Sequence, residues 1–195
     1  MLVALLASVL AYIIGSVSAA ILVCRALGLP DPRSDGSGNP GATNVLRLGG
    51  KKPAAMTLAG DLVKGLLPVA IANALTDDTV TIALVGLGAL LGHIYPIFFD
   101  FKGGKGVATA FGVTFGLHPL AGFAAAACWG ISAKLFKRSS LAALITFSLL
   151  PLYWFWRTEP TYAVLSVLIA GFLYFTHRSN IERLLNGTEP TIGKR

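Results

Sequence analysis

The chain has 195 residues, of which 54% are hydrophobic and only 13% carry a charge. Soluble domains contain about 25% charged residues, so roughly half of the usual solvating charge is missing. A soluble fold of this length could not bury so much apolar surface, whereas a lipid bilayer can accept it. The formal net charge is +7, but the Lys and Arg residues lie in short segments between apolar runs. No aromatic-interleaved basic stripe is present, so we expect no nucleic-acid partner.

The apolar runs predict an all-α polytopic membrane protein with a single domain over residues 1–195. A spanning helix needs about 20 apolar residues, and several runs approach that length. A longer run after Lys105 is interrupted by His118-Pro119, which predicts two short helices because proline opens helices and the residue before it resists them. The expected helices cover residues 1–24, 53–75, 78–98, 105–117, 119–135, 140–156 and 160–176.

The distribution of basic residues predicts how these helices cross the membrane. With about seven crossings, all of the 16 Lys and Arg residues except Lys64 and Arg157 lie on one face. A single crossing of the interrupted run would split this set. The positive-inside rule therefore favours a periplasmic N-terminus, a cytosolic C-terminus and a cytosolic basic face. The aromatic run 153–156 then falls at the outer interface, where aromatic belts occur.

A glycine-rich polar segment, residues 36–44, follows the first expected helix. Its glycines let the backbone turn so that successive N–H groups point at one anion, and Arg47 can bind a phosphate through two hydrogen bonds. A flexible polar loop is the simpler interpretation, but the alternation of glycine with small polar residues favours an anion site. The candidate ligand-binding residues are Gly36, Ser37, Gly38, Asn39, Gly41, Thr43, Asn44 and Arg47.

A second glycine-rich turn, residues 101–106, opens the expected helix that follows it. Such a turn before a helix N-terminus is suited to an anion, and Lys105 adds a mobile positive charge. A plain basic turn is an equal alternative for this motif by itself, but two such segments on one face strengthen each other. The candidates here are Gly103, Gly104, Lys105 and Gly106.

Three further groups of polar residues are candidates. His177 and Asn180, with Glu182, fall near one another at helical spacing and are either structural or part of the site. Ser140, with Ser139, predicts a helix cap or a second contact to an anion. Asp61 and Lys64 lie three residues apart inside an expected helix, where charges are usually paired; they predict a structural ion pair or a contribution to the site. We interpret His93 as a hydrogen-bonding residue in the wall of the site.

The motifs resemble those of a known enzyme family. The runs GSGNPGATNVLR (36–47), LGHIYPIFFDFKGGKGVATAFG (91–112) and HRSNIERLLNG (177–187) resemble three signatures of the bacterial acyl-phosphate:glycerol-3-phosphate acyltransferases, and the likeness covers essentially the whole chain. It implies an enzyme of the bacterial inner membrane with its active site facing the cytosol. The implied reaction transfers a fatty acyl group from acyl phosphate to the primary hydroxyl of sn-glycerol 3-phosphate, giving lysophosphatidate and orthophosphate.

The resemblance also implies roles for individual residues. Ser37 and Arg47 match positions needed for activity, and the residues around them would hold the acyl phosphate. Lys105 and its neighbouring glycines match the glycerol-3-phosphate loop. His177 and Asn180 match important polar positions, while Glu182 matches a structural one. No metal-ligand spacing is visible, and we expect neither a metal nor a cofactor, because an acyl phosphate is already activated.

Several alternatives remain open at this stage. The general base is either His177 or an oxygen of the acyl phosphate itself. A transporter of phosphorylated metabolites would also want basic glycine-rich loops, although the outer loops are nearly bare; a non-catalytic scaffold for lipid synthesis is a third possibility. Membrane lipid is an expected partner. The lability of acyl phosphate favours a soluble acyl-phosphate synthase that docks on the basic face.

Overall fold

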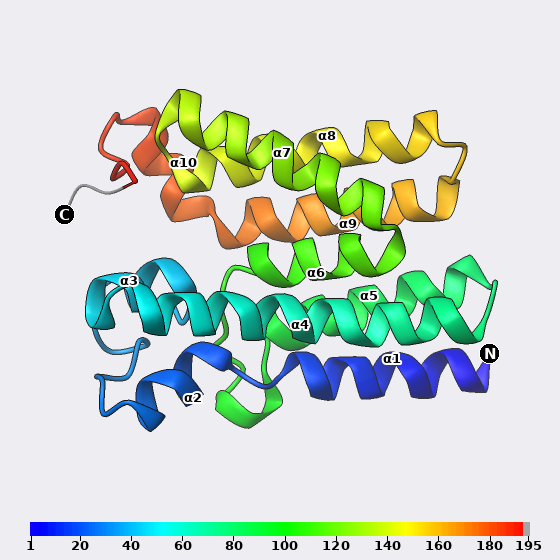
Figure 1. The fold of residues 1–195 in the computed structure, drawn as a ribbon, viewed down its shortest axis with the longest axis horizontal. Coiled ribbons are helices and arrows are strands. Elements are labelled where there is room, and N and C mark those ends of the chain that lie inside the picture. The colour runs from blue at the N-terminus through cyan, green and yellow to red at the C-terminus, as the bar shows by residue number, and fades with distance from the viewer. Residues whose placement is uncertain (193–195) are drawn as a thin grey trace. The chain divides into compact units, whose positions relative to one another are not determined.

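The computed structural model describes residues 1–192, and all regular elements in this range are helices. The chain divides into two compact units, Met1–Leu117 and the part from His118 onward. Figure 1 shows the helices of each unit, coloured from blue to green in the first and from green to red in the second. The all-α membrane architecture expected from the apolar runs is therefore confirmed.

In the first unit, α1 packs along α5, and α4 packs along both α5 and α6. The shorter α2 and α3 also contact α4. Glycine allows these helices to approach closely: a Cβ at Gly92 in α5 would collide with the Tyr12 carbonyl oxygen, and one at Gly112 in α6 with that of Leu62. Such small-residue contacts are typical of helix packing in membranes. The elements are α1 (Leu2–Gly15), α2 (Ala19–Ala26), α3 (Ala42–Gly49), α4 (Lys51–Leu75), α5 (Thr79–Ile94), η1 (Ile97–Phe99) and α6 (Val107–Leu117).

The first expected helix, residues 1–24, is interrupted, so its prediction as one continuous helix is wrong. α1 ends at Gly15, and α2 begins again at Ala19. Ser18 has an extended backbone, and its Oγ accepts a hydrogen bond from the Ile21 N–H at 3.5 Å. A serine side chain that can replace a backbone partner favours a helix N-terminus over a helix interior, which explains the restart at this position.

In the second unit, α8 packs against both α7 and α9, and α10 contacts α8 and α9. The core is formed by large apolar side chains, among which Trp154, Phe147 and Ile169 are almost fully buried. α9 and α10 meet at His177 with a bend of 67°. The elements are α7 (Pro119–Phe136), α8 (Ser139–Trp156), α9 (Pro160–Thr176) and α10 (Arg178–Leu185).

Within the described residues, 5 helices are long and apolar enough to cross a membrane, or up to 6 if α9 and α10 form one bent span. The broken helix Leu2–Ala26 is counted as one of them, and α6 is a shorter apolar helix. Each expected apolar segment is therefore helical, while the number of crossings and their direction stay predictions. α3 and α10 lie outside the expected spans; the helical spacing assumed for His177, Asn180 and Glu182 agrees with α10, while α3 was expected to be part of a loop up to residue 44.

Candidate functional site

Asn44, at the beginning of α3, holds the preceding segment in shape. Its side-chain Oδ1 accepts the Ser37 N–H at 2.9 Å, and its Nδ2 donates to the carbonyl oxygens of Pro32 and Asp35, each at 2.9 Å. Asn44 is 1% exposed. Gly36 has φ +63°, and a Cβ there would collide with Asn44 Oδ1. Asn44 therefore has a structural role. Its amide donates to two backbone carbonyls and accepts from one backbone N–H, which fixes the shape of the glycine-rich segment.

The glycine pattern predicted that the N–H groups of this segment converge on one anion, and this prediction is wrong. Gly36 N donates to Asp35 Oδ1 at 2.6 Å, Gly38 N donates to Asp35 O at 3.1 Å, and Gly41 N donates to Asn39 O at 2.9 Å. The segment becomes helical at Ala42, earlier than the loop expected up to residue 44. The donors suited to an anion are thus the N–H groups of Ala42 and Thr43 at the start of α3, which precede the first N–H donated within the helix turn, that of Asn44 to Gly41 O.

The polar side chains predicted to bind a ligand near the start of α3 are accessible to solvent. Ser37 and Thr43 are exposed, Asn39 is half-buried, and Arg47 is exposed in the last turn of α3. A hydroxyl, an amide and a guanidinium in these positions could bind a phosphate or a polarised carbonyl by hydrogen bonds.

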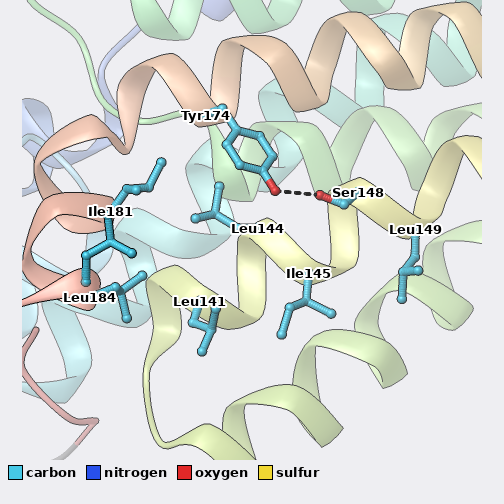
Figure 2. Close-up of a pocket in the computed structure, with 9 residues that line it drawn as sticks. Leu141, Leu144, Ile145, Ser148, Leu149, Tyr174, Ile181 and Leu184 are labelled. Carbon is cyan, nitrogen blue, oxygen red and sulfur yellow. Dashed lines mark hydrogen bonds between the residues drawn. The ribbon is translucent and has the colours of Figure 1, made fainter. Parts of the chain in front are cut away.

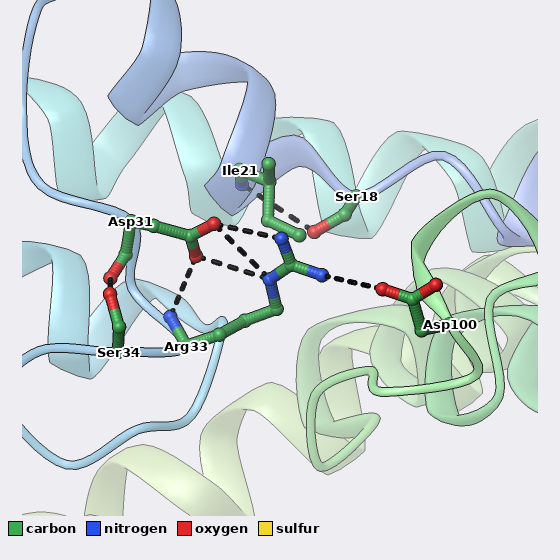
Figure 3. Close-up of polar contacts among 6 residues, drawn as sticks. All are labelled: Ser18, Ile21, Asp31, Arg33, Ser34 and Asp100. Atoms are coloured by element: carbon green, nitrogen blue, oxygen red, sulfur yellow. Dashed lines mark hydrogen bonds and ion pairs between the residues drawn. The ribbon is translucent and has the colours of Figure 1, made fainter.

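Arg33 connects this segment to the loop after η1, as Figure 3 shows. Its Nη2 lies 2.8 Å from Asp31 Oδ2, and its Nη1 lies 3.6 Å from Asp100 Oδ2. The hydrogen bond from the Arg33 side chain lowers the pKa of Asp31, against a smaller opposing effect of burial. Asp100 is the residue that ends η1, with a left-handed backbone of φ 55°. Arg33 therefore links the stretch of chain before the first glycine-rich segment to Asp100, the residue directly before the second.

The second glycine-rich segment sits on the C-terminal end of α5. The Gly103 N–H donates to Ile94 O and the Gly104 N–H donates to His93 O, each at 3.2 Å. A Cβ at Gly104 would collide with His93 Nε2 and lie 2.9 Å from the Pro40 carbonyl oxygen. The two segments therefore meet here, and only a residue without a side chain fits. Gly106, with φ +90°, turns the chain into α6, and Lys105 between these glycines is half-buried.

A buried polar network lies beneath this junction. Asp61 Oδ1 is 2.8 Å from Lys64 Nζ, and the two side chains are 4% and 8% exposed. The same Asp61 oxygen is 3.5 Å from His93 Nδ1. Thr109, in the first turn of α6, donates from Oγ1 to the Asp61 carbonyl at 3.0 Å and lies 3.1 Å from His93 Nδ1. The predicted ion pair is present within α4, and the contacts of Asp61 with His93 and Thr109 connect it to α5 and α6.

In the second unit, Glu189 gathers the polar residues around α10. Its Oε1 accepts the Ser140 hydroxyl and the Asn180 amide, each at 2.6 Å, and its Oε2 accepts Arg183 Nε at 2.7 Å. Burial opposes the charge of Glu189, but these hydrogen bonds outweigh it and lower the pKa. Sequence reasoning missed Glu189. The signal for it was Gly187, whose φ of 70° ends α10 and returns the chain toward Arg183.

The remaining predicted residues of this unit are placed as follows. His177 is 3% exposed, and its Nδ1 donates to the Leu173 carbonyl at 2.8 Å. Glu182 is exposed on α10, so the buried carboxylate beside Asn180 is Glu189. The predicted cap by Ser139 and Ser140 is not formed, because α8 begins after Arg138 without a side-chain cap.

An apolar groove lies between α8, α9 and α10, as Figure 2 shows. Its volume is about 460 Å³. The polar contact in its wall joins Tyr174 Oη and Ser148 Oγ at 3.0 Å. One end adjoins Ser140 and Asn180 along the chain, through Leu141 and Ile181. The lining residues are Leu141, Leu144, Ile145, Ser148, Leu149, Tyr174, Ile181, Leu184 and Leu185.

Comparison with known proteins identifies the family. The family model described as glycerol-3-phosphate acyltransferase matches residues 5–187. The glycerol-3-phosphate acyltransferase of Thioalkalivibrio sulfidiphilus is 55% identical, over 98% of this chain and 96% of the relative. That of Hydrogenovibrio crunogenus is 54% identical, over 94% of this chain and 89% of the relative.

Two crystal structures of PlsY (YgiH), an integral membrane glycerol 3-phosphate acyltransferase, have the same fold. Its glycerol 3-phosphate form has a TM-score of 0.93 and 36% identity, covering 97% of this chain and 96% of that chain. Its lysophosphatidic acid form has a TM-score of 0.89 and 38% identity, covering 97% of this chain and 95% of that chain. The chain is an integral membrane acyltransferase and belongs to the glycerol-3-phosphate acyltransferase family.

Proposed function

We propose that the enzyme transfers a fatty acyl group from acyl phosphate to the primary hydroxyl of sn-glycerol 3-phosphate. The products are 1-acyl-glycerol-3-phosphate (lysophosphatidate) and orthophosphate, which makes this a first step of phospholipid synthesis. The observation that carries the proposal is the junction of two glycine-rich segments at Pro40 and Gly104, each of which leads into a helix N-terminus. Two adjacent anion sites suit a reaction in which donor and acceptor both carry a phosphate. The two ligand forms of PlsY support the acceptor and the product.

The chemistry needs alignment more than it needs an activated side chain. The hydroxyl oxygen of the acceptor attacks the acyl carbonyl carbon, the bond from that carbon to the phosphate oxygen breaks, and the hydroxyl proton leaves with the phosphate. Holding both substrates in line supplies much of the rate. Hydrogen-bond donors aimed at the developing oxyanion and at the leaving phosphate supply the rest.

We assign the donor to the first motif and the acceptor to the second. Ser37 and Arg47 contribute a hydroxyl and a guanidinium to the acyl phosphate, with Thr43 and Asn39 beside them, while Asn44 positions the segment. Lys105 and the first turn of α6 bind the phosphate of glycerol 3-phosphate. Both assignments rest on the exposed or half-buried positions of these side chains and on the resemblance of the motifs.

His177, Asn180 and Ser140 are proposed to contribute polar groups to the same reaction. For the proton we favour an oxygen of the acyl phosphate, a substrate-assisted route, over His177. The phosphate oxygens of the donor lie next to the reacting carbon and can take the proton directly, while the Nδ1 of His177 donates to the Leu173 carbonyl. If the His177→Gln variant binds both substrates normally but has no turnover, and its pH profile loses the acid limb, His177 is the base instead.

We further propose seven crossings, with a periplasmic N-terminus, a cytosolic C-terminus and an active site facing the cytosol of a bacterial inner membrane. The basic residues gathered on one predicted face support this orientation. Acyl phosphate is both labile and apolar, so direct delivery by a soluble acyl-phosphate synthase that docks on the basic face is the expected supply.

The test is orthophosphate release by the purified protein in a lipidic medium. Palmitoyl phosphate is supplied with and without glycerol 3-phosphate. In a parallel series palmitoyl-CoA replaces palmitoyl phosphate, and release of the CoA thiol is measured, because a thioester donor releases no orthophosphate. We expect release that requires both substrates and is lost in the Ser37→Ala variant, with Ser34→Ala, two residues before the glycine-rich segment, as the control. Release without glycerol 3-phosphate would indicate a hydrolase or a different acceptor. Turnover with the thioester only would overturn the donor assignment.

A further inference from the structure

His93 is a buried histidine for which the proposed reaction has no role. Its side chain is 5% exposed at the C-terminal end of α5. Nδ1 lies 3.1 Å from Thr109 Oγ1. The single hydrogen of the Thr109 hydroxyl is donated to the Asp61 carbonyl at 3.0 Å, and a carbonyl can only accept. Thr109 Oγ1 must therefore accept from His93, so the ring hydrogen is on Nδ1.

This tautomer leaves Nε2 as a hydrogen-bond acceptor. Nε2 faces the junction of the two glycine-rich segments, because a Cβ at Gly104 would collide with it and would lie 2.9 Å from the Pro40 carbonyl. In the described part of the chain, the hydrogen bonds of His93 use Nδ1 or the backbone. Asp61 Oδ1 lies 3.5 Å from the same Nδ1, and a carboxylate beside a ring N–H helps to hold the ring in its orientation.

We infer that His93 Nε2 accepts a hydrogen bond from the secondary hydroxyl of glycerol 3-phosphate. The inference rests on the proposed function and on the neighbouring position of Lys105, which we assign to the phosphate. The secondary hydroxyl is the one nearer to the phosphate, so it is the group that reaches a residue packed beneath Gly104. The primary hydroxyl lies one carbon further away, where it can meet the acyl carbonyl.

This contact gives the enzyme a means to select its acceptor. A phosphate ester without the secondary hydroxyl does not supply this donor to Nε2, and because the His93 side chain is only 5% exposed, the loss costs more than that of a surface hydrogen bond. Selection of this kind changes acceptor affinity and leaves the donor unaffected, because Nε2 has no part in proton transfer to the leaving phosphate.

Two substitutions separate this role from a purely structural one. In His93→Asn the amide nitrogen can take the place of Nδ1, which keeps the contact to Thr109 and removes the acceptor at Nε2. In His93→Gln the longer amide can place its oxygen near the position of Nε2, and the donor at Nδ1 is lost. A structural role through Nδ1 predicts that His93→Asn is the milder change, and our inference predicts that His93→Gln is.

The experiment measures KM and kcat with palmitoyl phosphate and either glycerol 3-phosphate or 3-hydroxypropyl phosphate, which lacks the secondary hydroxyl. For the wild type we expect a KM about 3- to 30-fold higher with the analogue. His93→Asn should raise the KM for glycerol 3-phosphate by about the same factor and add no further loss with the analogue. His93→Gln should stay within about 3-fold of the wild type, and the KM for palmitoyl phosphate should not change in either variant.

Three results would overturn the inference: equal use of both acceptors by the wild type, full discrimination between them in His93→Asn, or a loss confined to kcat. The first needs no variant, so it decides the matter even if a substitution prevents folding. A wild type that fails to turn over palmitoyl phosphate and glycerol 3-phosphate at all would contradict the proposed function instead.

Discussion

Lys64 Nζ donates a hydrogen bond to the carbonyl oxygen of Val17 at 2.8 Å, in the gap between α1 and α2. A helix that breaks within a membrane span leaves backbone carbonyls without partners, and each such group is costly in an apolar medium. Lys64 supplies the missing donor, and Asp61, 2.8 Å from the same Nζ, balances its charge. The ion pair therefore holds the broken helix against α4.

Removing Lys64 should be strongly destabilising. Lys64→Met leaves the Asp61 carboxylate buried without its ammonium partner, and we expect the free energy of unfolding to fall by about 3–5 kcal/mol. The double variant Asp61→Leu/Lys64→Met should lose less, because no charge is then left buried. Reversible unfolding in mixed micelles measures both, with the exposed Lys52→Met as control. A double variant as unstable as Lys64→Met would show that the charge is not the main cost.

The sequence predicts the ion pair of Asp61 and Lys64 but not the contact between Lys64 and Val17. Two opposite charges three residues apart inside an apolar helix indicate an ion pair, because an unpaired charge there is too costly. The break at Val17 is harder to see, since residues 1–24 are mostly apolar and hydropathy does not detect a change of backbone direction; Ser16 and Ser18 on either side of Val17 are its local trace. The contact between Lys64 and Val17 depends on tertiary packing of α4, which no local pattern reports.

Asn44→Ala should loosen the first motif without unfolding the protein. The substitution removes three hydrogen bonds that fix Ser37 and the carbonyls of Pro32 and Asp35. We expect a loss of about 1–3 kcal/mol in stability and a larger fall in turnover, because Ser37 is no longer held. Trypsin cleavage after Arg33 should become faster. Ser34→Ala, which removes one exposed hydrogen bond, is the control; unchanged cleavage in Asn44→Ala would contradict the positioning role.

Glu189 should make the stability of the protein depend on acid pH. Its pKa in the folded protein lies below the ordinary value of 4.5, so folding favours the carboxylate. The contribution is complete above the ordinary value and is lost as the pH falls through the lower folded value. The difference in unfolding temperature between the wild type and Glu189→Gln should therefore be largest near neutral pH and shrink below 4.5. Parallel curves at all pH values would exclude this contribution.

The candidate site shows the same limit of sequence reasoning in another form. The three motifs identify the polar residues because glycine, serine and basic side chains gather there, and the resemblance gives them roles. The reason for the glycines differs from the expected one: Gly104 is needed because His93 and Pro40 lie against it, and Gly36 because Asn44 does. Glu189 was missed because it lies outside any helix. The turn at Gly187 brings it back to its three partners, and no periodic pattern in the sequence predicts that turn.

Lys105 should govern the affinity for the acceptor. The residue follows Gly104 and lies two positions before α6 begins at Val107, so its positive charge can add to the attraction of the helix N-terminus for an anion. A hydrogen bond to a charged group contributes about 1.5–3 kcal/mol, so Lys105→Ala should raise the KM for glycerol 3-phosphate by about 10-fold or more, with little change in the KM for palmitoyl phosphate. Lys105→Arg keeps the charge and should recover part of the loss.

Steady-state kinetics with each substrate varied in turn provide the measurement of this effect. The matched control is Lys102→Ala, which removes an exposed cation of the same loop. A loss of affinity for palmitoyl phosphate only would assign this loop to the donor and exchange the roles of the two glycine-rich segments.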